Sequence, residues 1–260
     1  MPNIIEEARA INPQLIDIRR AFHRDPEISN QEERTAEKIL KILEEIGGFE
    51  IRSGIGGHGI LADLRGENTG KNIALRADMD ALSIQEETGL PFSSQNPGIM
   101  HACGHDGHMS MLLAAAQIIK EQQLVKRGKL KILFQPAEEL GSGATSMIKG
   151  GAIDDVEYIF GAHVRPFEEA ENGQASPAIH YASSCRMVIA FHGKPAHGAR
   201  PHLGINALDA AVQAVNAVNA IHLKPTDNYS VKATRFLCDS GVTNAIPALS
   251  LIHISEPTRL

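Results

Sequence analysis

Three short apolar segments of this chain run directly into residues of the kinds that bind metal ions. The segments and the residues that follow them are 72–77 with Asp78 and Asp80, 129–134 with Glu138 and Glu139, and 156–161 with His163. Apolar segments of this length, separated by helical patterns, are typical of an α/β fold in which the strands of one sheet end at a common edge. The pattern therefore predicts a mostly parallel sheet flanked by helices, with a site at the carboxyl ends of its strands.

Residues 101–108 form the densest group of ligand-type side chains. They are His101, Cys103, His105, Asp106 and His108, with two glycines between them. Thiolate and imidazole bind zinc and similar metals readily, and glycine lets the backbone fold tightly enough for neighbouring side chains to share a centre. An apolar helical pattern at 109–119 follows, so the cluster lies at a loop-to-helix junction, where free N–H groups also favour a thiolate. A capped helix start with surface histidines is the alternative, and the density of ligand types favours a metal site.

The carboxylates and the isolated histidine at the strand ends support the same interpretation. Glu138 and Glu139 are adjacent, and such a pair needs a nearby cation to remain ionised. For Asp78 and Asp80 a solvated turn is the alternative, and their place at a strand end modestly favours a functional site. A lone histidine is more often structural than a ligand, but His163 follows an apolar segment in the same way as the carboxylates do.

Composition excludes several classes of protein. The chain has 260 residues, enough for one large domain or two ordinary ones, and its net charge of −6 without a basic block argues against nucleic acid as a partner. The sequence has no start typical of a secretory signal and no apolar stretch long enough to span a membrane. Three widely spaced cysteines do not suggest a disulfide framework. These features predict a cytoplasmic protein.

The composition changes after about residue 170. A strand pattern at 185–192, a rigid polar loop at 193–202 and a long helix at 204–222 follow. These elements predict a second, smaller α+β domain. We therefore divide the chain into a first domain at 1–175, a partial second domain at 176–247, and a tail at 248–260.

Several of these motifs, in this order, resemble the metal-dependent N-acyl-amino-acid amidohydrolases. This group of dimetal peptidases includes hippurate hydrolases, auxin-conjugate hydrolases and N-acetyl-diaminopimelate deacetylases. The motifs lie at 76–80, 101–108, 136–139, 162–163 and 193–202. The resemblance implies that 1–175 is an incomplete catalytic domain and 176–247 part of a lid or dimerisation domain. The tail after Pro247 does not match the family, whose chain continues and supplies a last histidine ligand. His253 comes too early for that role, so we expect a truncated chain with little activity.

The resemblance also implies a set of site residues and their cofactor. It implies two divalent metal ions, manganese or zinc, with cobalt or nickel as alternatives. Cys103 resembles the bridging ligand, His105, Glu139 and His163 resemble further ligands, and Glu138 resembles the general base.

Residues outside this set have less defined counterparts in the family. His197 resembles a catalytic residue that reaches the active site of the other subunit of a homodimer, and Asn244 resembles a residue that contacts the substrate. The resemblance gives no firm role to Asp78, Asp80, His101 or His108.

The chemistry of amide hydrolysis agrees with these assignments. A metal pair about 3.5–4 Å apart both activates water and polarises a carbonyl, and a neighbouring carboxylate moves the proton. We therefore expect hydrolysis of small N-acyl amino acids, for example N-acetyl amino acids. One alternative is a hydrolase with Cys103 as nucleophile and His105 or His108 as base, which would leave Glu138 and Glu139 without a task. Another is a non-catalytic fragment that binds a metal or a partner.

Overall fold

The computed structural model describes residues 3–166, 170–176, 182–222, 224 and 230–259. The chain divides into two compact units, Met1–Asn172 and Gly173–Leu260, and each is described by itself. Within the described ranges, every helix is too short or too polar to cross a membrane.

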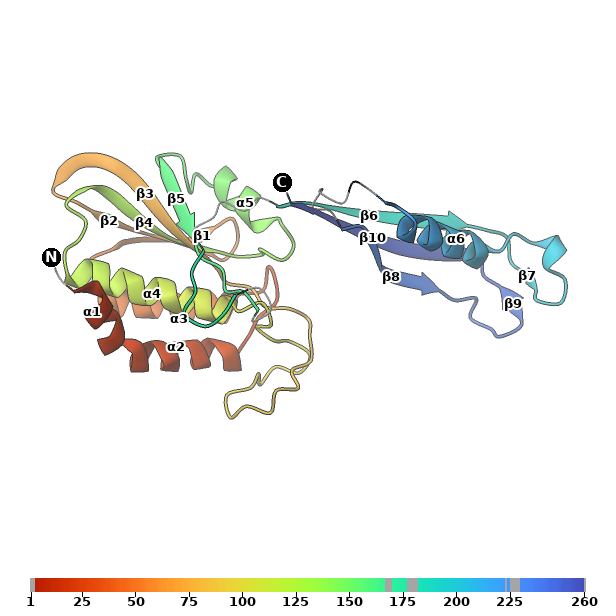
Figure 1. The fold of residues 1–260 in the computed structure, drawn as a ribbon, viewed down its shortest axis with the longest axis horizontal. Coiled ribbons are helices and arrows are strands. Elements are labelled where there is room, and N and C mark those ends of the chain that lie inside the picture. The colour runs from red at the N-terminus through yellow and green to blue at the C-terminus, as the bar shows by residue number, and fades with distance from the viewer. Residues whose placement is uncertain (1–2, 167–169, 177–181, 223, 225–229, 260) are drawn as a thin grey trace. The chain divides into compact units, whose positions relative to one another are not determined.

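The first unit is built on a five-stranded sheet (Figure 1). Its strands are β1 (Glu50–Ile55), β2 (Gly59–Arg65), β3 (Asn68–Asp78), β4 (Arg127–Gln135) and β5 (Tyr158–Gly161), in the order β1-β2-β4-β3-β5. β3 is parallel to both β4 and β5, whereas β2 is antiparallel to β1 and β4. Four strands therefore share one direction and only β2 opposes them, which confirms the predicted α/β fold with a mostly parallel sheet.

Five helices accompany this sheet. They are α1 (Ile4–Ala10), α2 (Asn12–Arg24), α3 (Glu33–Ile46), α4 (His105–Glu121) and α5 (Gly143–Lys149). Pro13 lies in the first turn of α2, where a backbone N–H has no partner within the helix, so α1 and α2 form two separate helices. α4 begins at His105, inside the ligand cluster, rather than at Met109. The helix therefore carries part of the candidate site on its first turn.

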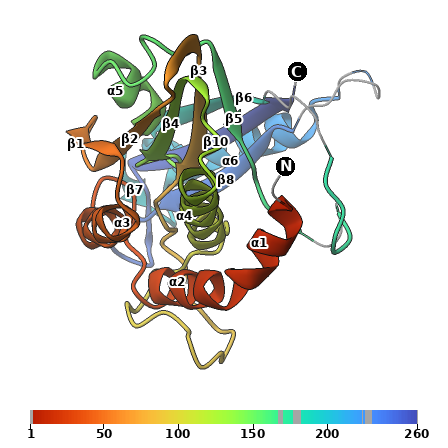
Figure 2. The same cartoon turned by 90° about the vertical axis from the view of Figure 1, so that its left-hand side faces the viewer.

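The apolar core forms on the two faces of the sheet, because successive strand residues point to opposite sides. Ile60 and Phe134 face α3 and α4, where they join Leu43 and Met109 in the main core. Leu61, Leu133, Met147 of α5 and Ala152 form a smaller cluster on the other face. Figure 2 shows α3 and α4 on one side of the sheet and α5 on the other. This packing anchors the sheet edge from which the site residues project.

The second unit has the α+β composition predicted for it. Its sheet has the order β6-β10-β8, formed by β6 (Ala182–His192), β10 (Leu249–Arg259) and β8 (Lys232–Cys238), and all pairs are antiparallel. α6 (Ala207–Asn219) packs on one face through Ala211, against Ile252 and Ile254. A separate two-stranded ribbon joins β7 (Ala196–His197) to β9 (Ala245–Ile246), and the short helix η1 (Pro201–Leu203) lies nearby in the chain. Residues 249–259, placed in the tail by sequence analysis, form the central strand of this sheet.

Two buried lysines on β4 fasten the segment that precedes β5. Lys129 Nζ lies 2.8 Å from Asp63 Oδ2 and also contacts Asp155. Lys131, which is 1% exposed, donates to Asp155 Oδ1 at 2.7 Å and to the Ala152 carbonyl oxygen at 2.8 Å. Hydrogen bonds from Lys129 and then Lys131 lower the pKa of Asp155 well below its usual range. Asp155 therefore ties the loop before β5 to the centre of the sheet.

We predict that Asp155→Asn lowers the free energy of unfolding by about 1–2 kcal/mol at neutral pH. This is modest for charged hydrogen bonds because the Asp155 side chain is 43% exposed. The depressed pKa stabilises the fold above the unfolded pKa of about 3.9, and this contribution is lost as the pH falls through the folded pKa. Urea unfolding should show a constant difference from roughly pH 5 to 8 that shrinks below about pH 4. Asp154→Asn, at the exposed neighbouring position, is the control, and an equal loss in both variants would contradict the prediction.

Candidate metal centre

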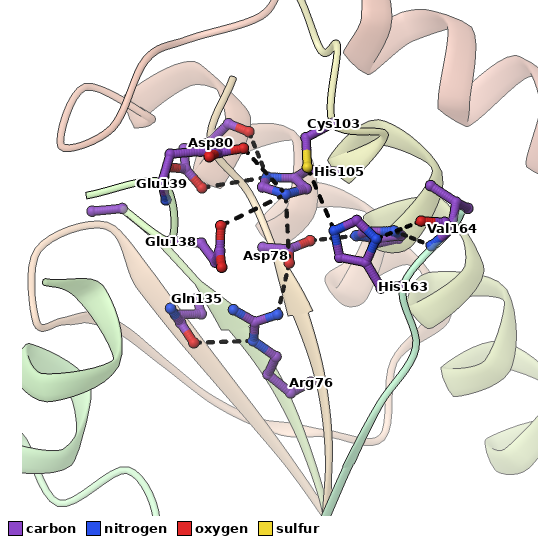
Figure 3. A network of polar contacts seen from close by, with 12 residues as sticks. Arg76, Asp78, Asp80, Cys103, His105, Gln135, Glu138, Glu139, His163 and Val164 are labelled. Carbon is purple, nitrogen blue, oxygen red and sulfur yellow. Dashed lines mark hydrogen bonds and ion pairs between the residues drawn. The ribbon is translucent and has the colours of Figure 1, made fainter. Parts of the chain in front are cut away.

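The carboxyl ends of three adjacent strands converge on one cluster of polar side chains (Figure 3). Asp78 ends β3 and pairs in register with Gln135, the last residue of β4. The next strand, β5, ends at Gly161, two residues before His163. The chain segments that follow these ends carry Asp80, Glu138 and Glu139 into the same region, as predicted from the order of motifs.

His105 lies at the middle of this cluster and is fully buried. Its Nδ1 lies 2.8 Å from the Asp80 carbonyl oxygen, an acceptor, so this nitrogen carries the proton. Its Nε2 is buried and has no hydrogen-bond partner among the described residues. Three carboxylates face that nitrogen, with Asp78 Oδ2 at 3.6 Å, Glu139 Oε1 at 3.8 Å and Glu138 Oε2 at 4.0 Å.

The ligand atoms of Cys103, His105 and Glu139 lie within 4.8 Å of one another. Ligand atoms that share a zinc-like ion stand about 3–4 Å apart, given bonds of about 2.0–2.3 Å. Like His105 Nε2, Glu139 Oε1 is buried and unpartnered within the described part of the chain. Two buried polar atoms that face each other without a hydrogen-bond donor would be costly, and a cation satisfies both. The residues present therefore fit a bound metal ion.

Cys103 connects this group to His163. Its Sγ lies 3.5 Å from His163 Nε2, and the contacts with His105 and His163 lower the pKa of the thiol. The ligand atoms of Asp78, His105, His108 and His163 form a second group within 4.8 Å. Sequence analysis predicted Cys103, His105, Glu139 and His163 as ligands, and the structure brings all four together.

His108 has a different task from the ligands beside it. Its Nδ1 donates to Asp78 Oδ1 at 2.5 Å, and its Nε2 accepts from the Val164 N–H at 2.9 Å. Both ring nitrogens are therefore occupied, which leaves no lone pair for a metal in this arrangement. His108 instead holds the segment after His163 to β3, a contact between distant residues that no local sequence pattern indicates.

The cluster carries an excess of negative charge. Burial raises the pKa of Asp78, but the hydrogen bond from His108 and the charge of Arg76 outweigh it, so that the pKa is lowered and the group is ionised. For His105, burial acts to lower the pKa, but its contacts with Asp80 and Cys103 outweigh burial and raise the pKa to about 11. Burial, followed by the charge of Glu139, raises the pKa of Glu138. Anionic groups that favour a protonated imidazole also favour a divalent cation.

The turn that carries Glu138 and Glu139 is held by residues from far away in the sequence. The Ala137 N–H donates to Glu32 Oε1 at 2.7 Å. The Glu139 N–H donates to Asp80 Oδ2 at 3.0 Å, and this oxygen also accepts from Ser29 Oγ at 2.6 Å. Sequence analysis missed Glu32 and Ser29, because an acid or a serine before a helical pattern is an ordinary helix start.

The remaining predicted residues are not among these candidate ligands. His101 is buried, which lowers its pKa to about 4, and neither of its ring nitrogens has a hydrogen-bond partner among the described residues. His197 and Asn244 belong to the second unit, where they are neighbours: the Gly198 N–H donates to the Asn244 carbonyl oxygen at 2.6 Å. His197 pairs in register with Ala245, so the ribbon of β7 and β9 positions both residues.

Residues 74–258 match the sequence profile of peptidase family M20/M25/M40, and the chain therefore belongs to this family. The match passes beyond Pro247, where we expected the likeness to end.

Characterised relatives share much of this chain. N-acetyl-L-cysteine deacetylase of Bacillus subtilis (strain 168) is 42% identical over 221 residues, which cover 83% of this chain and 53% of that protein. Hippurate hydrolase of Campylobacter jejuni is 35% identical over 257 residues, which cover 97% of this chain and 66% of that protein. The solved structure of the Bacillus subtilis YXEP protein, a dinuclear metal-binding peptidase of the M20 family, has a TM-score of 0.69 and 32% identity. That match covers 96% of this chain and 65% of the solved one, so the chain spans roughly half to two thirds of these relatives.

We predict that Co²⁺ added to this protein gives the near-ultraviolet charge-transfer band of a cobalt–thiolate bond. Cys103 is half-buried beside His105 and His163, and its lowered pKa favours the thiolate that binds metal. Cys103→Ser should abolish the band and weaken binding. Cys185→Ser, which removes an exposed thiol of the second unit, is the control and should leave the band unchanged. A band that persists in Cys103→Ser would show that Cys103 is not a ligand.

Proposed function

We propose that the protein hydrolyses the amide bond of small N-acyl amino acids, such as N-acetyl amino acids, with two divalent metal ions. The observation that carries this proposal is the convergence of Cys103, His105, Glu139 and His163 beside the partly exposed carboxylate of Glu138. The names of two relatives, an N-acetyl-L-cysteine deacetylase and a hippurate hydrolase, support the substrate class. The three free cysteines fit a reducing compartment, and we place the protein in the cytoplasm.

The residues would divide the work as follows. Cys103, His105, Glu139 and His163 would hold the two ions. Manganese or zinc suits this mixture of thiolate, imidazole and carboxylate, with cobalt or nickel as alternatives. When bound, the ions lower the pKa of a water and polarise the amide carbonyl.

Glu138 would act as the general base and then as the general acid. Its carboxylate is 39% exposed and lies next to the candidate ligands without forming a hydrogen bond within the described residues. It would accept a proton from the attacking water and deliver it to the leaving amine nitrogen. Burial and the neighbouring Glu139 raise its pKa, which brings a carboxylate closer to the range useful for proton transfer at neutral pH.

We predict that Glu138→Gln lowers kcat by about 10²–10⁴-fold while the metal content stays near that of the wild type. Glutamine keeps the size of the side chain but cannot accept the proton. Glu139→Gln should instead lower metal occupancy, because it removes a ligand charge. Hydrolysis of N-acetyl amino acids and elemental analysis of the purified variants measure the two effects. Equal metal loss in both variants would refute this division of roles.

A cysteine-nucleophile hydrolase is a second candidate, favoured by the 3.5 Å separation of Cys103 Sγ and His163 Nε2 and by the lowered pKa of the thiol. Sequence analysis named His105 or His108 as its base, but His105 donates to Asp80 and His108 is occupied at both nitrogens. Under this mechanism, chelators would leave turnover intact, thiol alkylation would abolish it, and Glu138→Gln would have little effect.

We further propose that the protein acts as a homodimer in which His197 and Asn244 contact the substrate. His197 would donate a hydrogen bond to the developing oxyanion in the active site of the other subunit, and Asn244 would help to orient the substrate. The proximity of the two residues on the ribbon of β7 and β9 supports their joint action.

We predict that mixing His197→Ala subunits with Glu138→Gln subunits restores part of the activity that each variant lacks. In a mixed dimer, one site would combine an intact His197 with an intact Glu138. Turnover after subunit exchange, with the mixed dimers verified by mass spectrometry, is the measurement. Verified mixed dimers without recovered activity would show that His197 acts within its own subunit or not at all.

A further inference from the structure

Glu32 has a fully buried carboxyl group that contacts the backbone of the turn carrying Glu138 and Glu139. Glu32 is the residue before α3, and its side chain is completely inaccessible to solvent. Its Oε1 accepts a 2.7 Å hydrogen bond from the N–H of Ala137, which lies 105 positions further along the chain. We propose that Glu32 is a positioning residue that holds the 136–139 turn in the conformation that directs Glu138 and Glu139 to the same metal centre.

The backbone of the turn shows why such an anchor is needed. Ala137 has a φ of 48°, in the left-handed region that residues with a Cβ rarely adopt. Side chains of consecutive residues point to opposite sides of an extended chain. Here Glu138 Oε2 and Glu139 Oε1 both lie within 4.0 Å of His105 Nε2. The left-handed residue changes the direction of the backbone just before this pair, at the point where both carboxylates turn toward one centre.

Close packing leaves the turn little freedom once it is formed. The Gly143 N–H donates to the Ala137 carbonyl oxygen at 3.1 Å. A Cβ at Gly143 would lie 1.6 Å from the Pro136 carbonyl oxygen, so only glycine fits there. Asp80 fixes the far side of the turn by accepting the Glu139 N–H. Glu32 fixes the near side, at the strained residue itself, which is where unfavourable backbone geometry requires support from its surroundings.

Glu27 provides a matched control in the same segment. It is 6% exposed, and its Oε2 accepts hydrogen bonds from the N–H and hydroxyl of Thr35 at 2.7 and 2.9 Å. Both carboxyl groups are thus buried acceptors near the start of α3. Only Glu32 reaches the 136–139 turn.

The test compares Glu32→Ala, Glu32→Leu, Glu32→Gln and Glu27→Ala in the protein. Zn²⁺ titration by calorimetry measures metal affinity, and hydrogen exchange of the Ala137 amide measures the anchor directly. We expect Glu32→Ala and Glu32→Leu to bind Zn²⁺ about 10–100-fold more weakly, as is typical when a group that supports a ligand is lost. The Ala137 amide should exchange faster in both. Glu32→Leu fills the volume of the lost side chain, so it can still be compared with Glu27→Ala if Glu32→Ala does not fold.

Rescue experiments separate positioning from general stability. Glu32→Gln keeps an oxygen acceptor and should retain near-normal Zn²⁺ affinity and Ala137 protection. Glu27→Ala should lower thermal stability without weakening Zn²⁺ binding beyond twofold. Adding Ala137→Gly to Glu32→Leu should recover part of the affinity, because glycine adopts a positive φ without the steric cost.

The positioning role of Glu32 rests on the proposed function for the roles of Glu138 and Glu139, but failure of the positioning role and failure of the proposed function give different results. Unchanged Ala137 exchange in Glu32→Leu, or equal loss of Zn²⁺ affinity in Glu27→Ala and Glu32→Leu, would overturn the positioning role. If Glu32→Leu weakens Zn²⁺ binding and exposes the Ala137 amide while the wild type hydrolyses no N-acyl amino acid, the positioning role stands and the proposed function fails.

Discussion

The candidate centre depends on the contacts of one residue, Asp80, which belongs to neither group of candidate ligands. Its carbonyl oxygen accepts from His105 Nδ1, and its Oδ2 accepts from the Glu139 N–H and the Ser29 hydroxyl. The first contact occupies Nδ1 of His105 and leaves its Nε2 facing the centre, and the second holds the Glu139 backbone beside it. An imidazole and a carboxylate from different segments thus acquire a fixed separation before any ion binds. Such outer contacts set both the orientation and the basicity of metal ligands.

The two strand ends beside Asp80 are coupled by a second set of contacts. Arg76 donates to Asp78 Oδ2 at 2.6 Å, Asp78 accepts from His108, and His108 accepts from the Val164 N–H. This series crosses from β3 through the first turns of α4 to the segment after β5. Each member has its charge or lone pairs satisfied by the next, so the arrangement is stable in a buried setting. The loop that carries His163 is therefore positioned by side chains that need no metal ion.

Much of the fold and the convergence of the candidate ligands could be predicted from the sequence, because the strands and the residues that follow them form local patterns. β4 ends at Gln135, three residues before Glu138, and parallel strands end at one edge of a sheet. The supporting residues could not be predicted, because their partners are distant in the chain. Glu32 accepts a hydrogen bond from Ala137, which lies 105 positions away in the chain. Ala137 has a positive φ, a conformation that an alanine in the sequence does not predict. The antiparallel direction of β2 and the start of α4 at His105 likewise follow from tertiary packing.

The place of β5 at the edge of the sheet makes the two sides of the centre unequal in local stability. β5 has four residues, all exposed, and pairs only with β3 among the described strands. His105, by contrast, begins a helix of 17 residues whose side chains fill the main core. Short edge elements open at lower free energies than core helices do. Transient opening of β5 would release His163 while Cys103 and His105 keep their positions, so an ion on the His163 side would exchange with solution sooner than one on the His105 side.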